Sequence, residues 1–131
     1  MSLFDTVLRD VLRTVLGPAI AIALLSPLAF APAFGETWRQ AGLVTSALVP
    51  FYILQTCSAS TIAAVDVLRL HAQRVIREIV FLVGATAVLL ATLRAGWSLP
   101  TIAMALSVFG CGFYIASLWW VRGLLRVGER A

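Results

Sequence analysis

Long apolar runs alternate with short polar segments along the chain, and four such runs are present. They extend over about residues 14–34, 41–65, 75–93 and 99–121, and the charged residues lie mainly between them or at their ends. At a rise of 1.5 Å per residue, about 20 apolar residues cross the roughly 30 Å hydrocarbon layer of a bilayer. The pattern therefore predicts four transmembrane helices, at residues 4–33, 41–69, 75–94 and 98–122.

The composition fits a chain that is surrounded by lipid. Hydrophobic residues make up 61% of the 131 residues and charged residues only 12%, with a mean hydropathy of +0.98. A soluble domain carries about 25% charged residues, because its surface must be hydrated. Only helices and closed barrels satisfy the backbone in lipid, and runs of this length are too long for barrel strands. We therefore expect an all-α integral membrane protein in which residues 1–131 form one four-helix domain.

Three prolines interrupt the first run: Pro18, Pro27 and Pro32. Proline removes a backbone donor from a helix, so we expect a kinked first helix that ends near Pro32. A cleavable secretory signal peptide is the alternative, because Ala29-Phe30-Ala31 and Ala31-Pro32-Ala33 resemble its cleavage motif. Two aspartates ahead of the run, and the proline directly after the first motif, favour a helix that is retained.

The arginines are distributed unequally among the connections. All ten basic residues are arginine, and eight of them lie before the first run, around the connection between the second and third, or after the fourth. These eight are Arg9, Arg13, Arg69, Arg74, Arg77, Arg122, Arg126 and Arg130. Only Arg39 and Arg94 lie in the other two connections. Because cytoplasmic connections are enriched in basic residues, this pattern predicts that both termini are cytoplasmic. Arginines spread between apolar runs form no single basic stripe, so we expect membrane lipids and no nucleic acid as partners.

The second run carries the strongest candidate for a substrate pathway. Its candidate residues are Gln55, Ser58, Ser60, Thr61 and Asp66. Polar side chains within a span avoid lipid, so this patch either lines a pathway for a polar substrate or forms hydrogen bonds between helices. Asp66 either belongs to the same pathway or pairs with Arg69, which follows about one turn later.

No other group of residues predicts catalysis or a cofactor. The sequence contains no nucleophile–base pair, metal-ligand cluster or phosphate-binding loop, so we expect neither an enzyme nor a need for metal or cofactor. Cys57 and Cys111 lie in apolar runs without metal or redox spacing, which favours a structural role. Gly84 and Gly110-x-Gly112 are expected to permit close packing of helices.

Two stretches resemble a known family of membrane transporters. The first is the connection 31–42, and its pattern residues are Phe34, Gly35, Trp38, Ala41 and Gly42. The second begins with Leu48-Val49-Pro50-Phe51-Tyr52-Ile53-Leu54-Gln55 and continues to the arginine-bearing turn at 69–74. Together they resemble the C-terminal part of the polysaccharide biosynthesis (Wzx-like) oligosaccharide flippases of the MATE-like superfamily. The resemblance covers nearly the whole chain, from about Leu12 to Arg126.

The resemblance implies a place in the bacterial inner membrane and a role in cell-surface polysaccharide or lipopolysaccharide biosynthesis. The implied substrate is an undecaprenyl-linked oligosaccharide, whose hydrated head must cross the hydrocarbon layer. Members of that family have more helices, arranged in two lobes around a cavity, whereas four are expected here. The implied partners are therefore the missing N-terminal transporter helices, or further copies of this chain.

Two other functions fit a four-helix membrane protein. One is a stand-alone small transporter or lipid-carrier protein, similar to the GtrA-like proteins in length and helix number. A small multidrug transporter would need a carboxylate in the first span, and residues 14–34 contain none. The other is an accessory membrane subunit with no transport of its own.

Overall fold

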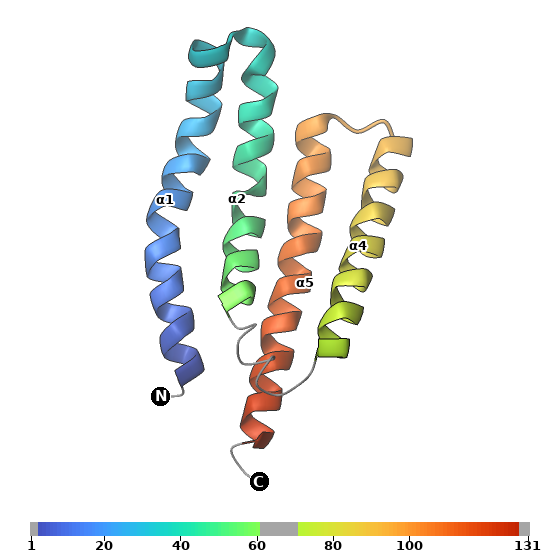
Figure 1. Ribbon diagram of the computed structural model, residues 1–131. Coiled ribbons are helices and arrows are strands. Elements are labelled where there is room, and N and C mark those ends of the chain that lie inside the picture. The colour runs from blue at the N-terminus through green and yellow to red at the C-terminus, as the bar shows by residue number, and fades with distance from the viewer. Residues whose placement is uncertain (1–2, 61–70, 129–131) are drawn as a thin grey trace.

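The computed structural model describes residues 3–60 and 71–128, and these residues form four long helices (Figure 1). The helices are α1 (Leu3–Phe34), α2 (Arg39–Ser60), α4 (His71–Arg94) and α5 (Leu99–Gly128). A short 3-10 helix, η1 (Glu36–Trp38), precedes α2. Each of the four long helices is long and apolar enough to cross a membrane. The prediction of an all-helical, multi-pass membrane protein is confirmed at this level.

The helix ends differ from the predicted ones where charged or proline residues flank the apolar runs. Helix α1 continues through Pro32 to Phe34, α4 begins at His71 rather than 75, and α5 continues beyond 122 to Gly128. Arginine has a high helix propensity, so a charge at the end of an apolar run does not end the helix. The second helix was expected to reach residue 69, and the part beyond Ser60 lies outside the described residues.

Glycine residues with positive φ allow both described connections between long helices. Gly35, at φ 99°, donates its N–H to the Ala31 carbonyl at 2.8 Å and ends α1. Gly96, at φ 68°, follows α4, and the N–H of Trp97 bonds back to the Thr92 carbonyl at 3.2 Å. The bonds at Gly96 and Trp97 form the usual Schellman ending of a helix, whereas Gly35, with ψ 163°, leaves the helix in an extended conformation.

The helices lie in a row whose order in space differs from their order in the chain. Helix α1 packs on α2, α2 packs on α5, and α5 packs on α4, so the row reads α1, α2, α5, α4 (Figure 1). The two termini lie at one end of the row, and the α1–α2 and α4–α5 connections lie at the other. Consecutive helices therefore form two hairpins, which are joined through α2 and α5.

Helices α1 and α2 approach closely at Gly42. A methyl group added at Gly42 would lie 2.5 Å from the Ser26 backbone oxygen and 3.1 Å from the Pro27 Cα. Ser26 is buried there, and its hydroxyl donates to the Ile22 carbonyl of its own helix at 2.6 Å. Small residues at helix interfaces permit this backbone contact, which supplies van der Waals packing where lipid provides no hydrophobic driving force.

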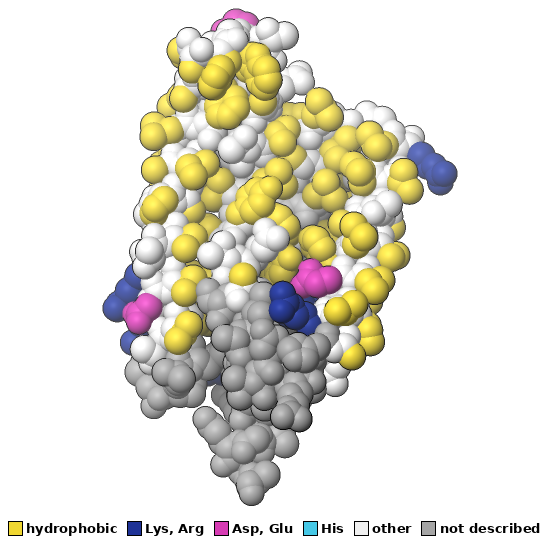
Figure 2. Space-filling model, viewed as in Figure 1, with side chains coloured by type: hydrophobic (Ala, Val, Ile, Leu, Met, Phe, Trp, Pro, Cys, Tyr) yellow, Lys and Arg dark blue, Asp and Glu magenta, His cyan; other side chains and the backbone are white. Residues whose placement is uncertain are grey.

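The outer surface is apolar, and hydroxyl groups lie between the helices. The most exposed large side chains include Leu24, Leu28, Leu82, Val108 and Trp119, whereas the buried polar ones are Ser26, Ser58, Thr92, Ser107 and Ser117. Figure 2 shows apolar side chains over the middle of the visible face and charged ones toward its ends. This distribution suits a protein whose middle is surrounded by hydrocarbon.

Candidate functional site: a polar cluster between three helices

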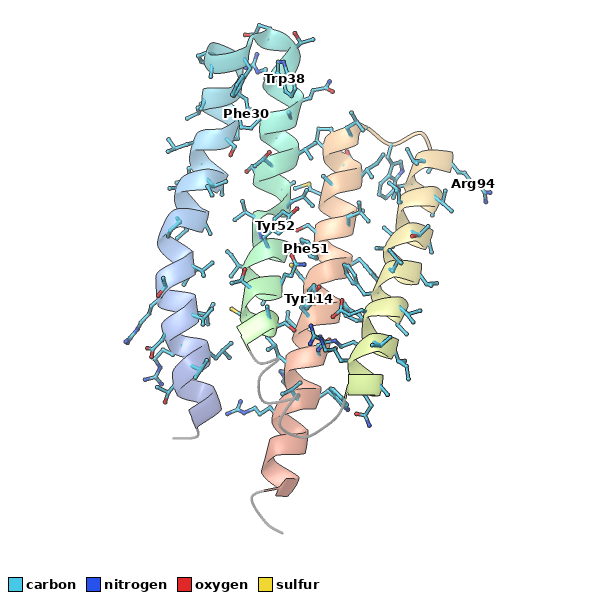
Figure 3. All side chains as sticks on the ribbon, in the orientation of Figure 1. Phe30, Trp38, Phe51, Tyr52, Arg94 and Tyr114 are labelled. Atoms are coloured by element: carbon cyan, nitrogen blue, oxygen red, sulfur yellow. The ribbon has the colours of Figure 1, made fainter. Side chains whose placement is uncertain are left out.

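Gln55, the first residue of the predicted patch, lies where α2 meets α5. It is half-buried, and its side chain lies close enough to the Tyr114 hydroxyl of α5 to act on that hydroxyl. Tyr114 is only 4% exposed. Figure 3 shows Tyr114 and the α2 residue Phe51 close to the facing sides of these two helices. Polar groups of α2 and α5 thus come together at Gln55, and the interhelical hydrogen bond itself stays a prediction.

A pair of opposite charges on α4 acts on the same hydroxyl. The Arg77 Nη2 donates to the Glu78 Oε1 at 2.9 Å, and the charges of both residues act on the Tyr114 hydroxyl. The Arg77 side chain is 14% exposed and the Glu78 side chain 49%. Gln55, Tyr114, Arg77 and Glu78 therefore form one polar cluster, contributed by α2, α5 and α4. We call it the polar cluster below.

The polar cluster lies well inside the candidate spans. Tyr114 is fifteen positions from Leu99, where α5 begins, so it lies about 22 Å along the helix from the α4–α5 connection. Arg77 lies inside the candidate span that extends from Ala72 to Arg94. Charged and amide groups at such depth are costly in hydrocarbon and commonly mark functional positions.

Aromatic rings hold the three helices together beside the polar cluster. Phe51 of α2 stacks on Phe81 of α4 with centroids 5.9 Å apart and planes 9° apart, and Tyr114 contacts both rings at 5.7 and 5.5 Å. Gly110 faces the Phe51 ring, and Gly84 faces the Phe109 ring, each so closely that a methyl group would clash. Aromatic pairs contribute about 0.5–1.5 kcal/mol each beyond area burial. The rings therefore fix the spacing of the helices that carry the cluster.

The glycine predictions are correct at two positions and wrong at the third. Gly84 and Gly110 pack against rings of neighbouring helices. Gly112 is exposed and has no heavy atom within 4 Å of an added methyl group, because it lies on the outward side of α5. Both cysteines are free, with Cys57 buried and Cys111 partly buried, in keeping with a structural role.

The remaining patch residues are placed only in part. Ser58 is 2% exposed and so faces the packed interior of the described bundle. Ser60 is the last residue of α2, and its side chain is not among those described. Thr61 and Asp66 lie outside the described residues. The structure thus gives the burial of Gln55 and Ser58, and the choice between a substrate pathway and interhelical hydrogen bonding stays a prediction at all five residues.

The connection that carries the family pattern forms one wall of an open groove. The groove has a volume of about 830 Å³ and lies between η1, the first half of α2 and the first two turns of α5. Trp38 and Ala41 line it, together with Leu48 of α2 and Leu106 of α5. Figure 1 shows the α1–α2 hairpin extending past the α4–α5 connection, which leaves this side open.

The other pattern residues stabilise the turn itself. The Phe34 ring lies 5.7 Å from the ring of Phe30 and 6.1 Å from that of Trp38, measured between centroids. Gly35 supplies the positive φ, and Gly42 supplies the backbone contact with α1. Figure 3 shows Phe30 and Trp38 together at this end of the row. All five residues of the pattern thus have structural contacts or conformations that account for their type.

Sequence reasoning missed three members of the polar cluster. Tyr114 and Glu78 were not singled out in the predicted helices that contain them, and Arg77 was counted only among the arginines that predict the orientation. The available signal was the position of Arg77 behind Val75 and Ile76, at the start of an apolar run. An arginine with apolar residues on both sides is a candidate for partial burial.

Comparison of the chain with models of known protein families, with curated proteins and with solved structures finds no match. Among the described residues, no group of three or more His, Cys, Asp or Glu side chains comes together. The functional assignment therefore depends on the geometry described above and on the resemblance of the sequence pattern.

Proposed function

We propose that this chain is part of a polysaccharide transporter, a flippase for lipid-linked oligosaccharides in a bacterial inner membrane. It performs no chemical reaction on its substrate. The observation that carries the proposal is the polar cluster, which combines an amide, a phenol and an ion pair inside candidate spans. Groups of this kind can hydrogen-bond to sugar hydroxyls, which find no partners in hydrocarbon.

The distribution of arginine supports an orientation with both termini in the cytoplasm. Among the described residues, Arg9, Arg13, Arg74, Arg77 and Arg122 lie on the halves of the helices nearer the termini. Arg39 and Arg94 lie at the opposite ends. The polar cluster then belongs to the cytoplasmic half of the bilayer, where a substrate made in the cytoplasm would first be bound.

The open arrangement of the helices supports the view that other helices complete the transporter. The described helices form a row, and the polar cluster has walls from α2, α5 and α4. A carrier for a large hydrated head needs groups on the opposite side of its pathway as well, as in transporters built from paired repeats. Missing N-terminal helices would supply them in a split transporter, and a second copy would supply them in an oligomer.

Complementation of a flippase-deficient bacterial strain tests the proposal. The chain is expected to fail alone and to restore surface polysaccharide when it is expressed with the N-terminal helices of a flippase. Success alone would instead support the stand-alone transporter. Failure in both settings, with the protein present in the membrane, would reject a role in polysaccharide export.

Matched variants test whether the polar cluster takes part in transport. Q55L and Y114F each remove a polar group of the cluster and are expected to reduce complementation. T86A is the control, because Thr86 is exposed on α4 and its hydroxyl bonds to the Leu82 carbonyl of its own helix at 2.8 Å. Equal export by all three variants would mean that the polar cluster has no part in transport.

A further inference from the structure

The open groove between η1, α2 and α5 has free polar side chains at one end only. Thr37 and Gln40 line the end nearest η1, together with Trp38, and all three side chains are exposed. We call this end the mouth. The other lining residues are apolar except Thr45, whose hydroxyl is bonded to the Ala41 carbonyl of its own helix at 2.9 Å. The groove therefore offers hydrogen-bonding groups at its mouth and an apolar interior, which is the polarity of a lipid.

The groove is about as long as one leaflet of the bilayer. From Gln40 to Leu48 it follows eight positions of α2, about 12 Å along the helix. One leaflet contributes about 15 Å, half of the roughly 30 Å hydrocarbon layer. Beyond Leu48 the two helices close, because Gly110 of α5 faces the Phe51 ring of α2 so closely that a methyl group would clash. A transmembrane helix of a partner would extend through both leaflets, whereas a lipid acyl chain ends near the middle of the bilayer.

The charges around the mouth favour an occupant that is recognised without charge. None of the described residues that line the groove is charged. Glu36 and Arg39 flank the mouth in the sequence, and they pair with each other at 3.6 Å. The side chains of Thr37, Trp38 and Gln40 provide uncharged hydrogen-bond donors. Such donors complement the ester carbonyls of a phospholipid, which lie at the membrane–water interface where tryptophan is enriched.

We propose that the groove binds one acyl chain of a membrane phospholipid in the leaflet opposite the two termini. The chain lies between α2 and α5 as far as Leu48 and Leu106, and its ester carbonyl accepts a hydrogen bond at the mouth. The groove volume of about 830 Å³ lies within the range of about 300–1,000 Å³ that is usual for small-molecule sites. This site concerns a lipid of the surrounding membrane and does not depend on the proposed transport of oligosaccharides.

Native mass spectrometry of the purified chain tests the site. The protein is released from mixed micelles that contain equal amounts of phosphatidylglycerol and phosphatidylcholine, and the lipids retained are counted. Wild type is expected to retain one phospholipid with either headgroup equally, because the lining is uncharged. A41F places a ring in the groove and is expected to lose this lipid. A87F is the matched control, since Ala87 is exposed on α4, outside the groove lining, and its replacement should leave retention unchanged.

Photolabelling of the wild type locates the lipid and does not depend on the folding of A41F. A phospholipid with a diazirine at the end of one acyl chain is expected to label residues 44–48 or 102–106. Labels confined to α1 and α4 would overturn the proposal, as would equal lipid retention by wild type and A41F. A clear preference for one of the two headgroups would contradict recognition by an uncharged mouth. A dimer that A41F dissociates would also overturn the proposal, because a second copy would then occupy the groove.

Discussion

The Ser46 hydroxyl of α2 donates a hydrogen bond to the Ala23 carbonyl of α1, with an oxygen–oxygen distance of 2.8 Å. In an uninterrupted helix, the N–H four residues later would bond to that carbonyl. That residue is Pro27, which has no N–H. Ser46 thus satisfies an acceptor that the proline leaves open, one turn after the Gly42 contact. Pro27 would weaken an isolated helix. In this structure it leaves the Ala23 carbonyl available for a hydrogen bond from the neighbouring helix.

Replacing Ser46 by alanine is expected to destabilise the α1–α2 hairpin by about 1 kcal/mol, a common value for a hydrogen bond between membrane helices. The loss should be smaller in a P27A background, because an alanine N–H at position 27 can bond to the Ala23 carbonyl. Unfolding in mixed micelles gives the four free energies of this double-mutant cycle.

T45A is the control for the Ser46 cycle. Thr45 is also partly buried on α2, but its hydroxyl bonds to the Ala41 carbonyl of its own helix at 2.9 Å. T45A should lower the free energy of unfolding less than S46A does, and this loss should be the same with proline or alanine at position 27. Equal costs for S46A with and without Pro27 would mean that the two positions are not coupled.

Replacement by alanine is expected to have different effects on stability at Gly42 and at Gly112. A methyl group at Gly42 would lie 2.5 Å from a backbone oxygen of α1, so G42A must separate the helices, at a cost of about 1–3 kcal/mol. G112A meets no atom within 4 Å and gains helix propensity, so it should be neutral or slightly stabilising. Thermal unfolding of both variants in the same detergent compares them. A G42A protein as stable as G112A would contradict the close α1–α2 contact.

Removal of the Tyr114 hydroxyl tests for a hydrogen bond to Gln55 without changing the aromatic packing. We expect such a bond between the half-buried amide and the hydroxyl, so Y114F should lower the free energy of unfolding by about 1 kcal/mol. Y52F is the matched control, since Tyr52 lies on α2 and is 55% exposed. The measurement is again unfolding in mixed micelles, and similar losses for the two variants would speak against a specific Gln55–Tyr114 bond.

Labelling of single cysteines tests the proposed orientation. In a C57S/C111S background, E36C and A95C report on the two connections opposite the termini, and Q73C reports on the terminal end of α4. All three positions are exposed. We expect a membrane-impermeant maleimide to label E36C and A95C in intact cells from which the outer membrane has been removed. Q73C should react only after the inner membrane is permeabilised, and the reverse pattern would place both termini outside.

Of the residues in the polar cluster, the sequence identified Gln55 as a candidate. It did not identify Tyr114, Arg77 or Glu78. An amide in an apolar run is conspicuous, because it needs a hydrogen-bond partner away from lipid. Tyr114 and Phe51 are ordinary residues of apolar helices, and their roles follow only from the packing of α2, α5 and α4. Arg77 and Glu78 were expected near the start of the third helix, and that position does not show that they face α5 and Tyr114.

The sequence by itself determined the number of spans and the pairing of consecutive helices into hairpins, because the hydrocarbon layer requires long apolar runs and the connections are short. Only the tertiary structure decided the order of the helices in the row and the face that each presents to its neighbours. The physical reason is that lipid and a helix interface are similarly apolar, so the hydrophobic pattern does not mark the packed face. Small residues, ring stacking and single hydrogen bonds such as Ser46 to Ala23 mark it instead.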